Sequence, residues 1–558
     1  MFIYPKEGLL FVMAKFNRAA GQPPGGRLTS PVQSAETTPS LVTGEGAPGF
    51  ARNPKSETFL LTVGGFLGGE KTFYESGDER DELFRLLIRE LSVTDPIWVA
   101  GFVKWLRTDA NMRTASLIAA AEYVWARRDE QGSGRTGTVH PTPLISTRQV
   151  VSSVLRRADE PGEMIGYWNA HYGRQIPKPM KRGIADAVRY LYNEYNVLKY
   201  DSPKSNFRMA DVLNLVHASP DSAKESALFD YLMVRRYGRE GYEVNPELGM
   251  IRMREEIMDI PVEDRRTFML ARPYALAEAG MTWESLAGWL QGPMDAAAWQ
   301  TAIPTMGYMA KLRNLRNFDK AGVSSEVADV VSRQIADLDN VASSRQLPFR
   351  FYSAYKSTST FRWHDALQKA LDHSLVNVPS LRGHTLILVD RSISMFSRLS
   401  TKSDMTFAEQ AAIFGSALAK RAEAATLVQF GDSSRLVEFS NTTPLLRMAD
   451  KFARMGGTDT PRAVRQWFKS GVHTRVIIVT DEQYGYGFSS YRDRENWVDS
   501  IVPKDVPVYT WNLVGYRAGH GLSGQGNRHT FGGLTPEAFS LISMLEAGIN
   551  ADWPWTKK

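Results

Sequence analysis

A buried strand that ends in an aspartate near residue 390 constrains the fold more than any other stretch of the sequence. The run 385–389 is aliphatic and β-branched, as strands buried on both faces of a parallel sheet are. Asp390 ends this run, and Ser392 and Ser394 follow it at alternate positions. One turn therefore gathers a carboxylate and two hydroxyl groups, which are oxygen ligands suited to a hard divalent cation.

Two later stretches could complete such a site. Thr458 follows a pair of glycines, which let the backbone come close, and the buried run 476–480 ends in Asp481. The carboxyl edge of an open parallel sheet is where such folds bind ligands. The sequence therefore predicts a metal site, most simply for Mg²⁺, formed by Asp390, Ser392, Ser394, Thr458 and Asp481. The alternative is that these residues only cap helices and form turns.

The pattern of elements divides the chain into three parts. Residues 56–375 are predicted as helix after helix with short connectors, which favours an α-solenoid of stacked helix pairs. Residues 376–558 alternate strands with helices, which predicts a doubly wound α/β domain. Residues 1–55 are rich in Gly, Pro, Ser and Thr without hydrophobic periodicity, so we expect a disordered arm.

Composition indicates the kind of cellular environment and partner that the protein has. The 558 residues include no cysteine, which excludes disulfides, thiolate metal sites and cysteine catalysis, and favours a reducing, cytoplasmic environment. The apolar stretch 8–13 is short and follows Lys6 and Glu7, so we expect neither a signal peptide nor a membrane partner. Met13 is an alternative start. A net charge of +6 favours binding of an anionic partner if the basic residues cluster.

Two predicted helices carry a basic face. Lys178, Arg182 and Arg189 fall on one side of the helix expected from residue 178, opposite its apolar positions. Arg313 and Arg316 share a face of a second helix. These faces could contact phosphates, or they could be solvated surface. The stretch 349–356, which interleaves aromatic rings with cations, could stack RNA bases or lie buried between domains.

The predicted metal site resembles the metal-ion-dependent adhesion site of von Willebrand factor A domains. In that family the two serines and the threonine contact Mg²⁺ directly, and the two aspartates usually act through water. The resemblance implies these roles for Ser392, Ser394 and Thr458, with Asp390 and Asp481 behind them. Ile393 stands where many members have glycine.

The helical part resembles the TROVE module of the Ro autoantigen family, which also occurs in bacteria. The likeness is carried by the stretches 59–74, 182–193 and 211–220, and by the order of a solenoid followed by a von Willebrand A domain. It implies HEAT-like repeats closed into a ring, which accepts 3′ single-stranded ends of misfolded RNAs and binds small noncoding Y RNAs outside. The residues assigned to RNA are Lys178, Lys181, Arg182, Arg189, Arg208, His217, Arg313 and Arg316.

We therefore expect a noncatalytic RNA-binding protein that holds Y-like RNA and the 3′ ends of misfolded RNA, and that acts in RNA quality control or degradation. It would be a monomeric protein in a ribonucleoprotein, and the resemblance suggests an exoribonuclease such as polynucleotide phosphorylase as a partner. The alternative is a metal-dependent protein-interaction scaffold without an RNA ligand. A metal-dependent nuclease is disfavoured, because two-metal sites need several carboxylates and this one offers mainly hydroxyls.

Overall fold

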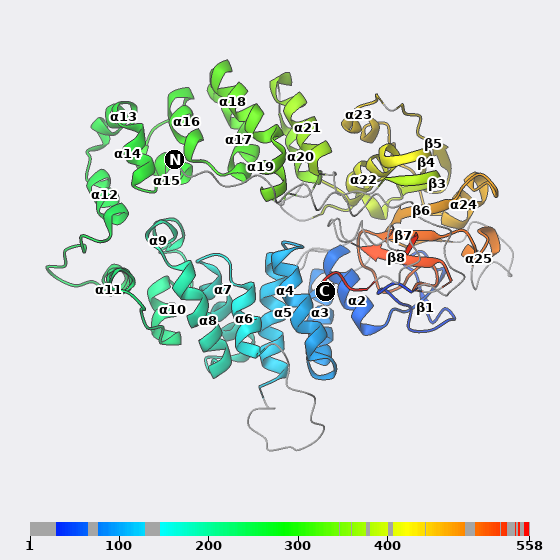
Figure 1. The fold of residues 1–558 in the computed structure, drawn as a ribbon, viewed down its shortest axis with the longest axis horizontal. Coiled ribbons are helices and arrows are strands. Elements are labelled where there is room, and N and C mark those ends of the chain that lie inside the picture. Colours follow the sequence, from blue (N-terminus) through cyan, green and yellow to red (C-terminus); the bar gives the residue numbers. More distant parts are fainter. Residues whose placement is uncertain are drawn as a thin grey trace, which may run out of the picture.

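Helices run around a central opening, and an α/β domain lies between the two ends of the helical row (Figure 1). This arrangement confirms the predicted helical ring with an α/β domain. The computed structural model describes residues 29–64, 76–128, 146–344, 346, 348–358, 360–374, 380–399, 405–440, 442–485, 497–524, 526–532, 542, 545–546 and 552–556. In these residues no helix combines the length and the apolar character needed to cross a membrane.

The first helical arm has its own apolar core, which includes Phe102, Ile165 and Ile184. Local sequence fixes the helix starts: Ser76 forms a capping box with Glu79, and Asp95 caps the next helix, which opens on a proline. The arm consists of α2 (Pro54–Gly64), α3 (Gly77–Thr94), α4 (Pro96–Thr108), α5 (Arg113–Ala126), α6 (Thr147–Val154), α7 (Glu160–Tyr172), α8 (Lys178–Leu191), α9 (Glu194–Tyr200), α10 (Met209–Val216) and α11 (Ala223–Tyr237).

The second arm returns on the other side of the opening, and its apolar core continues into the α/β domain without a break. Its elements are α12 (Gly249–Met258), α13 (Val262–Ala271), α14 (Pro273–Glu278), α15 (Trp283–Leu290), α16 (Ala296–Ala302), η2 (Ile303–Thr305), α17 (Tyr308–Ala321), α18 (Ser325–Ala336), α19 (Leu338–Ser344), α20 (Pro348–Ser357), η3 (Phe361–Trp363) and α21 (His364–Ser374).

The α/β domain is built on a six-stranded sheet in the order β5-β4-β3-β6-β7-β8, parallel except for the edge strand β5. Ile387 and Leu388 of β3 pack into different apolar clusters on opposite faces, as the doubly wound prediction requires. The strands are β3 (Leu381–Asp390), β4 (Ala422–Phe430), β5 (Ser434–Leu436), β6 (Arg475–Thr480), β7 (Val508–Asn512) and β8 (Arg528–Gly532). The helices are η4 (Ser394–Phe396), α22 (Phe407–Arg421), α23 (Leu445–Ala449), α24 (Thr460–Trp467) and α25 (Trp497–Ile501).

Helix α22 ends at Arg421, and β4 begins at the next residue, because alanine is compatible with both states and the strand is set by pairing with β3.

The N-terminal segment 29–53 is ordered, so the prediction of a disordered arm is wrong for residues 29–55. It forms the short strands β1 (Leu41–Val42) and β2 (Pro48–Gly49) and packs on the α/β domain. The Thr43 hydroxyl donates to the Tyr484 carbonyl at 2.7 Å, and Arg52 pairs with Glu482 in a buried ion pair at 2.7 Å. Its order comes from these distant contacts, which local composition does not show. Residues 1–28 lie outside the described part.

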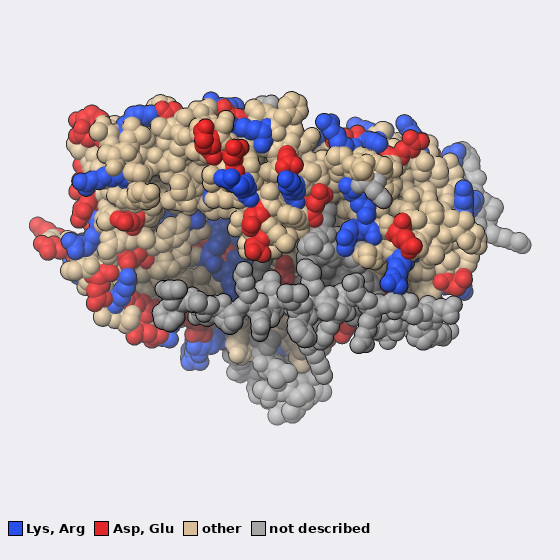
Figure 2. All heavy atoms as spheres, turned by 45° about the horizontal axis from the view of Figure 1, so that its top comes forward, with Lys and Arg blue, Asp and Glu red and all other residues tan. Residues whose placement is uncertain are grey.

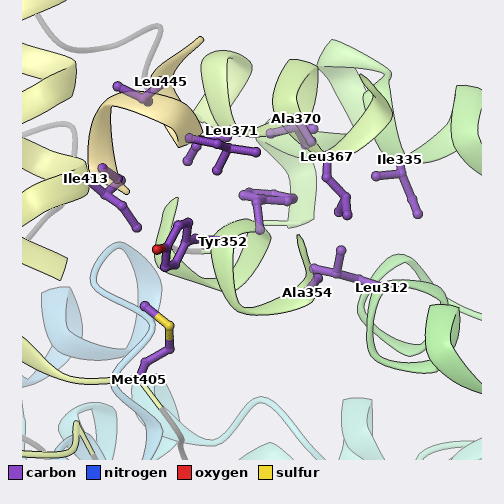
Figure 3. Close-up of a cluster of buried hydrophobic side chains, with 14 of the residues drawn as sticks. Leu312, Ile335, Tyr352, Ala354, Leu367, Ala370, Leu371, Met405, Ile413 and Leu445 are labelled. Carbon is purple, nitrogen blue, oxygen red and sulfur yellow. The ribbon is translucent and has the colours of Figure 1, made fainter. Parts of the chain in front are cut away.

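The α/β domain meets the second arm through apolar side chains. Leu371 of α21 lies on the side of Ile413 of α22 and Leu445 of α23, and the same apolar cluster includes Leu367 (Figure 3). The Tyr352 hydroxyl of α20 donates to Asp450 at 3.0 Å at the edge of this contact. We call this contact the chain-linked junction, because the polypeptide runs directly through it.

The α/β domain meets the first arm through segments far apart in sequence. Arg80 of α3 donates to the Val514 carbonyl at 2.7 Å. The Trp553 ring lies 5.3 Å from the rings of Phe59 on α2 and Trp98 on α4. We call this contact, together with the Arg52–Glu482 pair, the closing junction, because it completes the ring.

Candidate metal site and nucleic-acid interface

The two predicted aspartates lie at the ends of neighbouring strands, because β3 pairs directly with β6. Both carboxyl groups are buried. Asp390 Oδ1 accepts from the Ser392 amide at 2.8 Å, and its Oδ2 accepts from the Thr480 hydroxyl at 2.6 Å. The Ser392 and Ser394 hydroxyl oxygens lie 3.2 Å apart. Three of the predicted ligands thus form one turn at the carboxyl edge of the sheet.

Backbone hydrogen bonds hold the loop of Thr458 against this turn. The Ile393 amide donates to the Gly456 carbonyl at 3.1 Å, and the Gly485 amide, beyond Asp481, donates to the Thr458 carbonyl at 2.9 Å. A side chain on Gly456 would collide with the Asp432 carboxylate unless that side chain moved. We name the set Asp390, Ser392, Ser394, Thr458 and Asp481 the acid corner.

Burial makes ionisation of both carboxyl groups of the acid corner costly. Burial raises the pKa of Asp390, and burial together with the neighbouring Asp390 charge raises the pKa of Asp481 well above its ordinary value. Asp481 Oδ1 accepts from the Gln483 amide at 3.0 Å, while its buried Oδ2 has no hydrogen-bond partner among the described residues. A cation would offset both charges and satisfy this oxygen.

The donor set fits a hard cation. Groups of three or more His, Cys, Asp or Glu side chains that could hold a metal do not occur in the described residues. A cation at the acid corner would therefore depend on the hydroxyl groups for direct contacts, and hydroxyl and carboxylate oxygens are ligands for Mg²⁺. The residues present are compatible with the adhesion-site arrangement expected from the sequence.

Sequence reasoning missed two residues that shape the acid corner. The Thr480 hydroxyl, at the last position of β6, holds Asp390 Oδ2. Arg391 is buried and donates to three carbonyl groups, those of Ala408 at 2.5 Å, Phe452 at 3.3 Å and Ala453 at 2.9 Å. Arg391 lies within the predicted metal motif, but the sequence does not show its carbonyl partners, which lie at the start of α22 and in the loop after α23.

Helix α8 has the two faces that the sequence predicted. Ile184 and Val188 are buried in the core of the first arm, whereas Lys178, Arg182 and Arg189 are exposed. Arg189 pairs with Asp221 at 3.0 Å, a surface ion pair that solvent screens. Lys181, the remaining basic residue predicted on α8, is half-buried.

The two residues predicted at the start and end of α10 have different surroundings. Arg208 has a side chain only 11% exposed, and it pairs with Asp201 at 2.5 Å. Its guanidinium therefore holds the segment before α10 in this structure. His217 is exposed and caps the end of α10 with a left-handed backbone (φ 55°).

The second basic face lies on α17, in the opposite arm. Arg313 and Arg316 are exposed. Burial lowers the pKa of Arg350 on α20, and the positive charge of Arg313 lowers it further, so the two cations lie near each other. Phe351 and Tyr352 are buried. The interpretation of these two rings as buried between domains is therefore confirmed, and their prediction as an RNA-stacking surface is wrong.

Lys and Arg side chains occur on both arms and also inside the hollow between them (Figure 2). The predicted RNA residues divide between the two arms. The residues on α8 and α10 belong to one arm, and those on α17 to the other.

Comparison with known proteins gives a family match and a structural match. The family described as the TROVE domain matches residues 277–413, which run from α14 into α22. This segment does not include α8 or α10, which carried part of the resemblance in the sequence. A search of curated proteins found no match.

The crystal structure of the Ro (RSR) protein of Deinococcus radiodurans has a similar fold, with a TM-score of 0.59. The sequences are 17% identical, and the alignment covers 89% of this chain and 99% of the Deinococcus chain. The structural match thus extends over the helical ring and the α/β domain together. The chain therefore has the fold of this Ro protein, and its residues 277–413 match the TROVE domain.

Proposed function

We propose that the protein holds RNA without cleaving it, and that its ligands are a small Y-like noncoding RNA and the 3′ single-stranded ends of misfolded or structured RNA. The observation that carries this proposal is the exposed basic face of α8, directly opposite a buried apolar face. Lys178 and Arg182 form no ion pair with any described carboxylate, so their charges are available to phosphates. Phosphate contacts of this kind supply most sequence-independent affinity.

The family match supports the wider setting of this proposal. A TROVE-domain protein with the fold of a Ro protein fits a monomeric protein in a cytoplasmic ribonucleoprotein that serves RNA quality control. An exoribonuclease such as polynucleotide phosphorylase, tethered through the RNA, is the partner we propose. Degradation would then be the partner's chemistry, since the proposed role of this chain is to hold the RNA.

We further propose that the acid corner binds Mg²⁺. Ser392, Ser394 and Thr458 would contact the ion, and Asp390 and Asp481 would hold it through water. The buried carboxyl pair supports this role, since burial and the Asp390 charge raise the pKa of Asp481 and its Oδ2 has no hydrogen-bond partner among the described residues. Neutral hydroxyl ligands leave much of the cation's charge uncancelled, which favours an acidic group from a partner as the last ligand. This property supports the second candidate function, a metal-dependent protein-interaction scaffold.

Replacing Lys178, Arg182 and Arg189 by Ala together tests the RNA proposal. We expect weaker binding of an RNA with a single-stranded 3′ tail, and a salt dependence flatter by about 0.7 in log K against log[salt] for each lost phosphate contact. The matched control replaces Arg239, Arg266 and Lys369 by Ala, which removes the same charge from exposed cations already paired with acids. Equal affinity and slope in the two triple variants would favour the scaffold function instead.

A second measurement separates the metal from the RNA. The variant Asp390→Ala with Ser392→Ala should lose stabilisation by Mg²⁺, because a cation that binds only the folded protein stabilises it by mass action. RNA binding should remain, since the acid corner and α8 belong to different parts of the ring. Thermal melting with and without Mg²⁺, alongside an RNA titration, would show it. Loss of both properties together would contradict this separation.

A further inference from the structure

A cavity of about 490 Å³ lies in the first arm, outside the acid corner and away from the exposed face of α8. It is formed by α7, α9, the start of α10 and the segment 201–208 between them. In Figure 1, α9 borders the central opening of the ring. Its volume falls within the usual range for sites that hold a small ligand.

Aromatic rings supply much of the wall. Tyr167 of α7, Tyr192 just after α8, Tyr200 of α9 and Phe207 of the loop before α10 all line the cavity. Gly162 of α7 lets the loop approach, because a side chain there would come within 2.7 Å of the Phe207 carbonyl oxygen. Flat aromatic walls on a rigid frame suit a planar ligand that stacks, and RNA bases are bound in this way.

One wall residue carries a polar group without a partner. Tyr192 is only 4% exposed, and its hydroxyl has no hydrogen-bond partner among the described residues. A buried hydroxyl that makes no hydrogen bond destabilises the fold, so such groups in native proteins call for a ligand, a water or another explanation. The hydroxyl can donate and accept, which matches the polar edge of a base.

The charges at the cavity leave one cation available. Arg208 is engaged with Asp201, and Asp159 and Glu163 pair with Arg113. The Lys199 ammonium lies over the rings of Tyr195 and Tyr200, 5.5 and 5.1 Å from their centroids, and pairs with no described carboxylate. A phosphate beside the cavity would therefore meet an uncompensated ammonium group.

We propose that this cavity binds one nucleotide, with its base between the aromatic walls and against the Tyr192 hydroxyl, and its phosphate on Lys199. The nucleotide would come from the RNA strand, and to that extent the inference rests on the proposed function. A free nucleoside monophosphate offers the same chemistry, and the test separates the two sources. The site would hold the base of one unpaired nucleotide that remains part of the strand, whereas the basic face of α8 would contact only the phosphate backbone of the RNA.

The test uses a short single-stranded RNA that carries the fluorescent base 2-aminopurine, because stacking on tyrosine or phenylalanine quenches its emission. We expect quenching on binding to the intact protein. Phe207→Leu should weaken binding about tenfold by removing a stacking surface. Tyr192→Phe should weaken it about fivefold by removing one hydrogen bond, with little disturbance of the fold. Tyr242→Phe is the matched control, since it removes another buried hydroxyl without a partner, outside the cavity.

The second arm of the test uses the four free ribonucleoside 5′-monophosphates and saturation-transfer NMR. If Phe207→Leu and Tyr192→Phe both weaken the binding of the monophosphates, the result supports the site. This holds even if the protein bound no RNA and the proposed function failed. Quenching of the labelled RNA without binding of the monophosphates would assign the site to the strand. If both pocket variants bind RNA and monophosphates as the intact protein and the Tyr242→Phe control do, the inference is overturned. Unchanged quenching in folded pocket variants would overturn it as well.

Discussion

The two contacts that join the α/β domain to the helical ring differ in how they are built. At the chain-linked junction, aliphatic side chains of α21, α22 and α23 merge into one apolar core (Figure 3). At the closing junction, the contacts are a buried ion pair, an arginine on a backbone carbonyl and tryptophans from the last residues of the chain. The first contact is continuous in sequence, while the second brings together residues from both ends of the chain.

This difference indicates which junction holds the ring closed. The chain-linked junction is kept together by the polypeptide even if its packing weakens. At the closing junction the chain-terminal segments 29–53 and 552–556 are held by non-covalent contacts, so these contacts must keep the first arm on the domain. Loss of these contacts should therefore change the shape of the molecule, whereas loss of packing at the other junction should change only its stability.

The largest effect is expected from Trp553→Ala. It removes a ring that packs on both Phe59 and Trp98, and truncations of this kind cost about 3 to 5 kcal/mol. We also expect a larger radius of gyration in small-angle scattering. Leu371→Ala is the control at the chain-linked junction: it should cost a comparable amount in denaturant titration without enlarging the molecule. Equal scattering curves for the two variants would remove the distinction between the junctions.

Arg52→Met should cost about 3 kcal/mol at neutral pH, because it leaves Glu482 buried without its cation. Although burial raises the pKa of Glu482, Arg52 and the other neighbouring groups lower it below its ordinary 4.5. The ion pair therefore contributes stability above pH 4.5, and this contribution is lost as the pH falls through the lowered pKa. Denaturant titrations should show the variant approaching the intact protein in acid. A constant gap from pH 7 to acid would contradict the ion-pair explanation.

The variant Asp481→Asn concerns the residue beside Glu482. Since the raised pKa of Asp481 means that ionisation costs stability at neutral pH, the change should stabilise the metal-free protein by about 1 kcal/mol. The Asn side chain keeps an oxygen for the Gln483 amide. Stabilisation by Mg²⁺ should disappear in thermal melting. In a double variant with Arg52→Met, the changes in the free energy of unfolding should add if metal binding and ring closure are independent. A large deviation from the sum would show that the two are coupled.

The smallest effect is expected from Arg517→Ala, which breaks an ion pair with Glu57 across the closing junction. The Arg517 side chain is 59% exposed, and such pairs contribute less than about 1 kcal/mol. The scattering curve should stay that of the intact protein. A loss of unfolding free energy as large as that of Arg52→Met would mean that ion pairs at this junction stabilise the protein irrespective of their burial.

The sequence predicts the parts of this molecule whose signals are local. The runs that became β3 and β6 are apolar because both faces of the sheet are covered, and the residues after them mark the acid corner. The apolar and basic faces of α8 follow from helical periodicity. The order of residues 29–53 is not predictable in this way, because Arg52 and its partner Glu482 are 430 positions apart. The engagement of Arg208 with Asp201 also depends on a loop conformation that periodicity does not encode.

The adjacent residues Asp481 and Glu482 have a practical consequence for anyone who prepares this protein. One side chain belongs to the acid corner and the next to the closing junction. A shortened form that begins at Pro54 would look like a clean domain boundary, since a helix starts there. It would nevertheless strip Arg52 from Glu482 and leave an uncompensated carboxylate beside the acid corner. A shortened form that begins at Thr29 keeps this pair.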